Sequence, residues 1–173
     1  LTLVGTDPAV AVQLALFLQL GTTVSAATYY RHEIMTILRA LPGWRPSTAY
    51  DADHAVATYI GVASLFTGIV GIPLYIVAVD LVSNLTGGVF IAVIGVLLIG
   101  TGALQRVSDT VSMGSRKTPS LTDSILVGSV QGFAILPGIS RSGVTASALL
   151  FRSYDPPNAF RLSFLLSIPA SVG

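Results

Sequence analysis

Two long stretches without a charged residue restrict the fold of this chain more than any other feature. Residues 55–79 and 89–105 contain no Asp, Glu, Lys, Arg or His. A helix that crosses the hydrocarbon core of a bilayer needs roughly 20 mostly apolar residues. Only 10% of the 173 residues are charged, whereas soluble domains have about 25%. The sequence therefore predicts an all-α, polytopic integral membrane protein, with residues 1–173 forming a single membrane domain within the bilayer.

Two further segments have the composition of membrane helices. Residues 9–30 are uncharged, but Gln13, Gln19 and a cluster of Thr and Ser residues make them mildly polar. We expect this helix to pack against protein as well as lipid. Residues 158–173 begin another apolar segment. Pro73 lies inside the 55–79 span, where a kink is tolerated if neighbouring groups satisfy the freed backbone.

The polar loops give an orientation. Residues 31–54 and 106–123 together hold six of the nine Lys and Arg residues, and the short turn at 80–88 between the two spans holds none. Two spans separate the loops, so both loops lie on the same side of the membrane. Because positively charged loops remain in the cytoplasm, the sequence places both loops there.

The ends and the composition of the chain set further bounds. The chain opens on Leu1 and stops at Gly173 within an apolar run, so we expect an internal fragment of a longer membrane protein. The chain has no cysteine, which excludes disulfides and thiolate metal sites. The net charge is +1 and no basic tract is present, so nothing indicates binding to nucleic acid.

Residues 124–151 contain the most unusual segment, "ILPGISRSGVT" at 135–145. This region is too short for two full spans, which need roughly 40 residues. It forms either one kinked span or two half-helices that meet at Pro137-Gly138, because both residues disfavour a continuous helix. Arg141 is the only charged residue between Ser124 and Phe151.

If a new helix starts near Ser140, the break becomes an anion site. Ser140 is a good N-cap, and the first-turn N–H groups with the helix dipole attract negative charge. Arg141 adds a planar donor fork suited to phosphate, and Ser142 and Thr145 add hydroxyl groups. These features predict a site for a phosphate or pyrophosphate at membrane depth. The alternative is an ordinary kink, with Arg141 extending to the membrane surface.

Other kinds of site find little support. "GISRS" is not the G-x-S-x-G elbow, because Ser142 replaces the second glycine. Lys117 is the only lysine, so there is no Walker A motif. His32 and His54 lie in the polar loop without the spacing of metal ligands. We therefore assign no metal ligand to this chain.

Residues 14–24 and 162–172 align at a constant offset, with "LALFLQLGTTV" over "LSFLLSIPASV". Leucines coincide at two positions, and Thr23 coincides with Ser171. The pattern favours an internal repeat of the kind that builds inverted-topology membrane proteins. A second copy of the 135–145 break is then expected before residue 1.

The segments "QGFAILPGISRSGVT" and "FRLSFLLSIPASVG" resemble the undecaprenyl-pyrophosphate phosphatase family, the bacitracin-resistance membrane proteins. The family hallmark P-G-x-S-R-S-x-x-T matches from Pro137 to Thr145, and most of its F-S-F-L-L-x-x-P run matches from Leu162 to Pro169. The resemblance implies a multi-pass plasma-membrane enzyme with two re-entrant hairpins across an inverted repeat. Such an enzyme hydrolyses a polyprenyl pyrophosphate to the monophosphate and inorganic phosphate, which recycles the lipid carrier for cell-wall biogenesis.

The resemblance also implies roles for individual residues. Arg141 is the expected catalytic residue, which holds the pyrophosphate and stabilises the transferring phosphoryl group. Gly138, Ser140, Ser142 and Thr145 are the expected substrate-binding residues.

The family suggests a divalent cation, Mg²⁺ or Ca²⁺, held by an upstream hairpin with paired glutamates. No such motif is present, because Glu33 is the only glutamate. We assign no nucleophile in this chain and expect that the fragment alone is not a competent enzyme.

Two alternatives stay open at this level. A carrier or flippase for polyprenyl phosphates would use the same inverted repeat without hydrolysis. A structural membrane subunit would use Arg141 only to pair with a partner helix. The chain is also a candidate for homo-oligomer formation.

Overall fold

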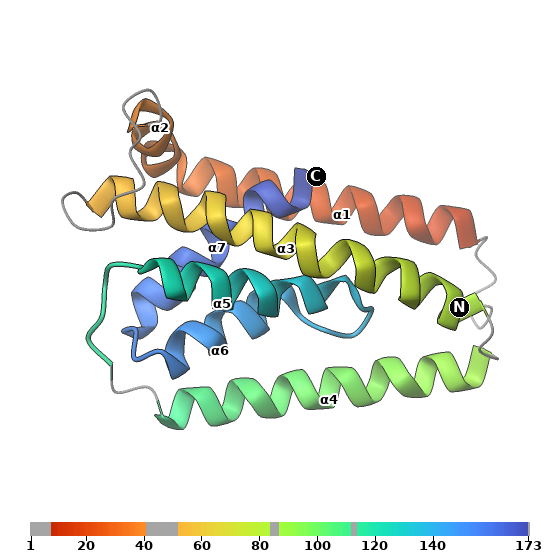
Figure 1. Cartoon of the computed structure of the whole chain (residues 1–173). Helices are drawn as coiled ribbons and strands as arrows, with labels where there is room; N and C mark the ends of the chain where they lie inside the picture. Colours follow the sequence, from red (N-terminus) through yellow and green to blue (C-terminus); the bar gives the residue numbers. More distant parts are fainter. Residues whose placement is uncertain (1–7, 41–51, 84–86, 112–113, 173) are drawn as a thin grey trace.

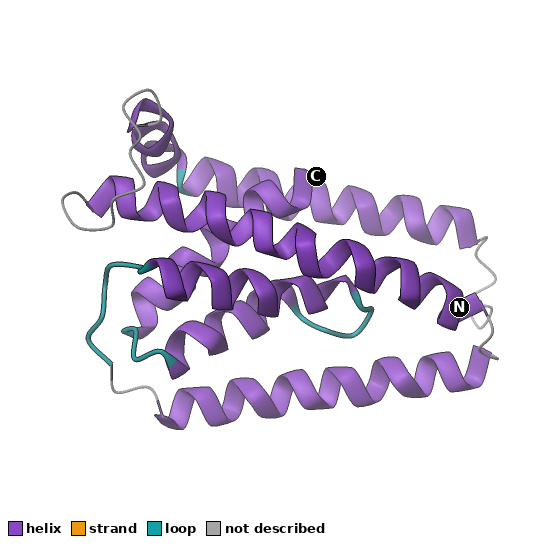
Figure 2. Ribbon diagram, in the orientation of Figure 1, coloured by secondary structure: helices purple, strands orange, loops and turns teal. Residues whose placement is uncertain are grey.

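The computed structural model describes residues 8–40, 52–83, 87–111 and 114–172. Every element in these ranges is a helix, which confirms the all-α prediction (Figures 1 and 2). In chain order the elements are α1 (Pro8–Tyr29), α2 (Arg31–Ala40), α3 (Ala52–Ser83), α4 (Gly87–Val111), α5 (Leu121–Gly132), the 3₁₀ turn η3 (Phe133–Ile135), α6 (Arg141–Phe151) and α7 (Pro156–Val172).

The long helices α1, α3 and α4 run along the length of the molecule, and the shorter α5 and α6 lie between α3 and α4 (Figure 1). Within α3 and α4, the segments His54–Ala78 and Ile91–Ser108 are long and apolar enough to cross a membrane. Both helices turn large aliphatic side chains outward, among them Leu65, Ile69, Ile76, Val96, Leu98 and Ile99. Outward apolar faces of this kind suit contact with lipid.

One end of the bundle, called the polar end below, is formed by α2, the start of α3, the end of α4, residues 114–120 and residues 152–155 (Figure 1). Arg31, Arg39, Arg106 and Lys117 are exposed there. The two segments predicted to share one side of the membrane therefore do lie at one end of the molecule.

The predicted loops were too long at their edges. Residues 31–40 form α2, because Ile34 and Ile37 recur on one face and pack against the core. Residues 80–83 continue α3 and residues 106–111 continue α4, since no proline or glycine interrupts either segment. Residues 52–54 belong to α3, and the rest of the first predicted loop, 41–51, lies outside the described residues.

Residues 124–151 form two half-helices rather than one kinked span. The 12 residues of α5 reach only about 18 Å along their axis, well short of a bilayer core. After η3 the chain turns, and α6 returns to the polar end beside α5 (Figure 1). This pair, residues 121–151, is called the hairpin below. The predicted re-entrant hairpin is therefore confirmed.

Small residues let the hairpin approach its neighbours closely. A Cβ atom at Gly128 of α5 would lie 2.3 Å from the carbonyl oxygen of Ala63 in α3. At the tip, Gly138 has a φ of 101°, and a Cβ atom there would lie 2.7 Å from the carbonyl oxygen of Ile94 in α4. Gly138 therefore allows both the left-handed turn and the contact with α4.

The core lies between α3 and the hairpin, and α7 completes it with Leu162, Leu165 and Leu166. The helices α1 and α7 contact each other and run in opposite directions (Figure 1). This antiparallel pairing agrees with the inverted repeat that aligned residues 14–24 with 162–172.

Candidate active site

The break in the hairpin starts a helix inside the bundle. Ser140 has extended backbone angles, and its Oγ accepts a hydrogen bond from the backbone N–H of Gly143 at 3.2 Å. Ser140 is therefore the N-cap of α6, as the sequence predicted. The N–H groups of Arg141 and Ser142 belong to the first helical turn, where no intrahelical acceptor exists.

Arg141 reaches from this first turn to the end of α7. Its Nη1 donates to the carbonyl oxygen of Ala170 at 2.8 Å and to Oγ of Ser171 at 3.3 Å. Nε and Nη2 have no hydrogen-bond partner within the described ranges. The guanidinium group is half-buried and keeps donors for a ligand. Both of its hydrogen-bond partners, Ala170 and Ser171, are half-buried residues of α7.

Arg141 borders two cavities. The α1-side cavity has a volume of about 350 Å³ and brings Ser140, Arg141 and Ser142 together with hydroxyl groups of α1 and α7; its lining is Thr22, Thr23, Ala26, Ser140, Arg141, Ser142, Phe164, Ser167 and Ser171. The Ser142 hydroxyl has no partner among the residues that the structure describes. Three of the five predicted site residues thus face one space that hydroxyl groups line.

The α3-side cavity has a volume of about 300 Å³ and lies on the other side of Arg141. Its polar lining is Ser64, Thr67, Gln131 and Arg141, and its apolar lining includes Ile72, Ile135 and Pro169. The side chain of Arg141 therefore belongs to both spaces.

The other two predicted substrate-binding residues lie elsewhere. Gly138 forms the turn against α4 and lines neither cavity. Thr145 is fully buried; its Oγ1 donates to the carbonyl oxygen of Arg141 at 2.8 Å and contacts Oγ of Ser163 in α7. Thr145 thus joins α6 to α7 one helical turn after Arg141. Gly138 forms the chain turn that precedes Ser140.

Sequence reasoning did not select Thr22 and Thr23 of α1. The repeat contained the signal, because its offset aligns these residues with Ala170 and Ser171 of α7. Both pairs lie beside Arg141: one lines the α1-side cavity and the other provides the Nη1 acceptors. The two helices related by the repeat therefore bring equivalent positions to the same guanidinium group.

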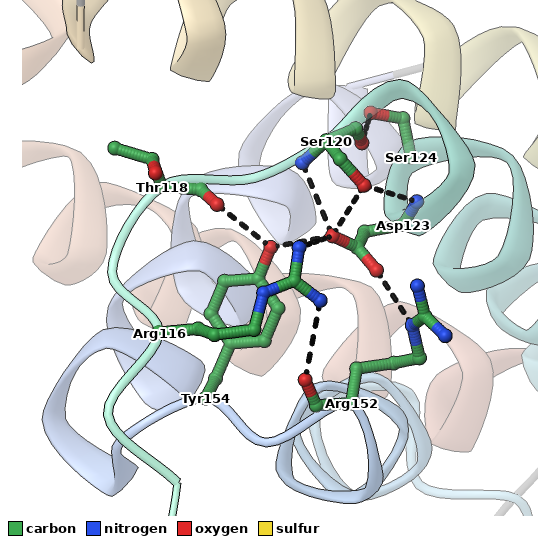
Figure 3. A network of polar contacts seen from close by, with 7 residues as sticks. All are labelled: Arg116, Thr118, Ser120, Asp123, Ser124, Arg152 and Tyr154. Carbon is green, nitrogen blue, oxygen red and sulfur yellow. Dashed lines mark hydrogen bonds and ion pairs between the residues drawn. The ribbon is translucent and has the colours of Figure 1, made fainter.

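The hairpin is anchored at the polar end by the fully buried Asp123 of α5 (Figure 3). Its Oδ2 accepts from Nη2 of Arg116 at 2.9 Å, from Oγ of Ser120 at 2.6 Å and from the hydroxyl group of Tyr154 at 2.7 Å, and its Oδ1 accepts from Nε of Arg152 at 2.7 Å. Arg152 follows α6 directly. One carboxylate therefore joins the start of α5 to the end of α6.

Two opposing effects determine the pKa of Asp123. Burial raises the pKa of the carboxyl group. Hydrogen bonds from Ser120, Tyr154 and Arg152 lower it by a larger amount, so the net pKa is about 2. Burial, and next the hydrogen bond to Asp123, raise the pKa of the Tyr154 phenol. The guanidinium group of Arg116 lies 5.0 Å from the centre of the Tyr154 ring. Asp123 is therefore ionised at neutral pH and accepts hydrogen bonds from four residues.

No cluster of three or more His, Asp or Glu side chains that could hold a metal ion occurs in the described part of the chain. Glu33 is bound to Nε of Arg161 at 2.7 Å, where α2 meets α7. These residues do not fit the divalent cation that the family resemblance suggests, so no catalytic step is assigned to a metal here.

Comparison with known proteins agrees with this geometry. Residues 2–173 match the family described as bacitracin resistance protein BacA. The chain belongs to the BacA family. The match includes every α-helix in the described ranges and every residue of the site, so the broken helix at Arg141 is part of a BacA domain. This family is membrane-bound, and the chain is a helical membrane protein.

Curated relatives carry the name undecaprenyl-diphosphatase. The protein from Haloarcula marismortui is 47% identical over 170 residues, which cover 97% of this chain and 62% of the relative. The proteins from Methanococcoides burtonii and Sulfurisphaera tokodaii are 42% and 37% identical, covering 98% and 95% of this chain and 63% and 58% of the relatives. This BacA chain thus spans about three-fifths of their length. No solved structure matches it.

Proposed function

We propose that the protein containing this chain hydrolyses a polyprenyl diphosphate of the undecaprenyl type to the monophosphate and inorganic phosphate. The observation that carries the proposal is the pair of free donors on Arg141, next to the first turn of α6 and beside the hydroxyl group of Ser142. Family membership and the name shared by the relatives support the same reaction.

The proposed chemistry uses this chain mainly for binding and charge. Nε and Nη2 of Arg141 hold the oxygens of the terminal phosphate, and the N–H groups of Arg141 and Ser142 add the positive end of the α6 dipole. The hydroxyl groups of Ser140 and Ser142 orient the diphosphate. Stabilisation of the phosphoryl group by positioned donors is the main requirement of phosphoryl transfer.

The reaction consumes one water molecule. The water oxygen forms a bond to the terminal phosphorus, and the bond from that phosphorus to the bridging oxygen breaks. The bridging oxygen stays with the lipid monophosphate, and the protons of water are shared between the products and bulk solvent. The group that activates the water is not assigned to any residue described here.

The orientation of the protein in the membrane follows from the positive charge of the polar end. If the positively charged polar end faces the cytoplasm, the hairpin enters and leaves from that side, and its tip points towards the outer face. The protein is then a multi-pass plasma-membrane enzyme whose site opens away from the cytoplasm. Its product, the lipid monophosphate, serves the recycling of the carrier for cell-wall biogenesis.

The direct test uses the complete protein in detergent with undecaprenyl diphosphate, and phosphate release and lipid monophosphate are measured together. Equal amounts of both products support the proposed reaction. Binding of the lipid diphosphate without either product would instead identify a carrier of lipid phosphates.

A further inference from the structure

Two polar atoms beside Arg141 lack partners. Oγ of Ser64 and Oε1 of Gln131 are both shielded from solvent and have no hydrogen-bond partner among the described residues. Gln131 is 2% exposed. Both residues line the α3-side cavity. Buried polar atoms are almost always paired, so two unpaired atoms on one cavity wall point to a ligand that fills the space between them.

The orientation of the Gln131 amide is determined by Thr67. The Thr67 hydroxyl lies 2.8 Å from the carbonyl oxygen of Ala63 and 3.1 Å from that of Gly128, so its proton is directed to these carbonyls. Its oxygen is free to accept from Nε2 of Gln131 at 3.3 Å. A flipped amide would place two acceptors against each other. Oε1 is therefore the unpaired atom of the Gln131 amide, and it can only accept a hydrogen bond.

The lining specifies the chemistry of the ligand. Gln131 needs a donor from the ligand, whereas Ser64 and Arg141 offer donors and Arg141 adds a positive charge. An anion that carries a hydroxyl group meets all three demands. Inorganic phosphate is such an anion, because it keeps at least one P–OH group at neutral pH. The terminal group of a phosphate monoester loses its last proton with a pKa of about 6.

We propose that the α3-side cavity is a binding site for inorganic phosphate, the product that the proposed hydrolysis releases. Its P–OH group donates to Oε1 of Gln131, and its oxygens accept from Oγ of Ser64 and from Arg141. The inference rests on the proposed function for the source of the phosphate, whereas the binding itself follows from the cavity. The α1-side cavity then holds the substrate, and the α3-side cavity holds the product.

The site should distinguish phosphate from sulfate and from a lipid monophosphate. Sulfate matches phosphate in shape but carries no proton at neutral pH, so Oε1 of Gln131 would face a bare anion oxygen. A short-chain prenyl monophosphate at about pH 7.5 is mostly without a P–OH group, since its last pKa is about 6. We expect both to bind more weakly than inorganic phosphate.

The test is a ³¹P NMR or calorimetric titration of inorganic phosphate into the complete protein without lipid, with sulfate and a short-chain prenyl monophosphate in parallel. Gln131→Leu and Ser64→Ala should each weaken phosphate binding roughly tenfold, the usual effect of losing a hydrogen bond to a charged group. Ser129→Ala is the matched control, because its hydroxyl group donates to the carbonyl oxygen of Ile125 within α5 and lines neither cavity.

Ser64→Ala also separates binding from folding. The variant removes an unpaired buried hydroxyl group, so its thermal midpoint should equal or exceed that of the wild type while phosphate affinity falls. Equal affinities for phosphate and sulfate, or unchanged phosphate affinity in both variants, would overturn the proposal. The complete protein could also bind phosphate in a way that depends on Gln131 and yet hydrolyse no lipid diphosphate. That result would support the phosphate site in the α3-side cavity and contradict the proposed function.

Discussion

Nη1 of Arg141 lies 2.8 Å from the carbonyl oxygen of Ala170, so the first turn of α6 is bound to the last turns of α7 across the middle of the bundle. This contact uses only one end of the guanidinium fork. It holds the group in place and leaves Nε and Nη2 free for a ligand. A point charge at the same position could not do both.

Arg141→Lys is therefore expected to be a poor substitute in the complete protein. A lysine ammonium can either bond to Ala170 or meet the phosphate, but it cannot form the bidentate contact. We expect a loss of at least roughly a hundredfold in kcat with undecaprenyl diphosphate, comparable to removing one transition-state donor. Arg106→Lys, at an exposed position, is the matched control and should keep full activity.

Asp123→Asn should destabilise the hairpin from the polar end. The change removes the negative charge that Arg116 and Arg152 share, while both guanidinium groups still reach solvent. We expect a loss of about 2–3 kcal/mol, less than the roughly 3–5 kcal/mol for a fully buried pair. The measurement is the unfolding free energy of Asp123→Asn and of the wild type in detergent. Equal stability of the two proteins would show that the network contributes nothing.

The Asp123 carboxylate also predicts that the stability of the folded protein depends on pH. The pKa of Asp123 is about 2 in the folded protein and 3.8 ordinarily. Because the folded-state pKa is lowered, its stabilising contribution is complete above the ordinary value and is lost as the pH falls towards the folded-state value. The difference in thermal midpoint between wild type and Asp123→Asn should therefore be constant near neutrality and shrink as the pH falls from about 4 to 2.

Gly128 and Gly102 offer a matched pair for the contact between α3 and α5. Gly128→Ala would place a methyl group 2.3 Å from the Ala63 carbonyl oxygen, whereas a Cβ atom at Gly102 meets nothing within 4 Å. We expect Gly128→Ala to lower stability by about 1–3 kcal/mol, as overpacking does, and Gly102→Ala to leave it unchanged or slightly higher. Thermal unfolding in detergent compares the two. A similar midpoint for both variants would contradict the close packing.

Thr145 and Ser163 test whether the end of the hallmark motif binds substrate or holds helices together. Thr145→Val keeps the shape but removes the contact with Oγ of Ser163. The structure predicts lower stability, no change in KM, and a double variant with Ser163→Ala that is less harmful than the sum of the single changes. A raised KM with unchanged stability would instead assign Thr145 to the substrate.

The spans and the break were predictable from local rules. Charge-free runs of sufficient length predicted α3 and α4, and Pro137-Gly138 followed by Ser140 predicted the start of α6. The helix α2 was missed because its charges resemble a loop when its contacts are unknown. Only the fold shows that Ile34 and Ile37 face a core.

The pairing within the site could not be predicted in the same way. Ser64 and Gln131 are single polar residues in apolar helices, where most such residues bond to their own helix. The hydrogen bonds from Arg152 to Asp123 and from Arg141 to Ala170 join residues 29 positions apart. Nothing in the spacing of the sequence indicates these partners. They depend on how α5, α6 and α7 pack.

The role of Arg141 in phosphoryl transfer is best measured by phosphate release from undecaprenyl diphosphate, with the Arg141→Ala variant of the complete protein beside an equally folded wild type. We expect a loss of at least about a thousandfold, since one arginine contributes roughly 10³–10⁵ to phosphoryl transfer where it acts. Thermal unfolding should show that the variant remains folded. Phosphate release at the wild-type rate by the folded variant would show that Arg141 is not a catalytic residue.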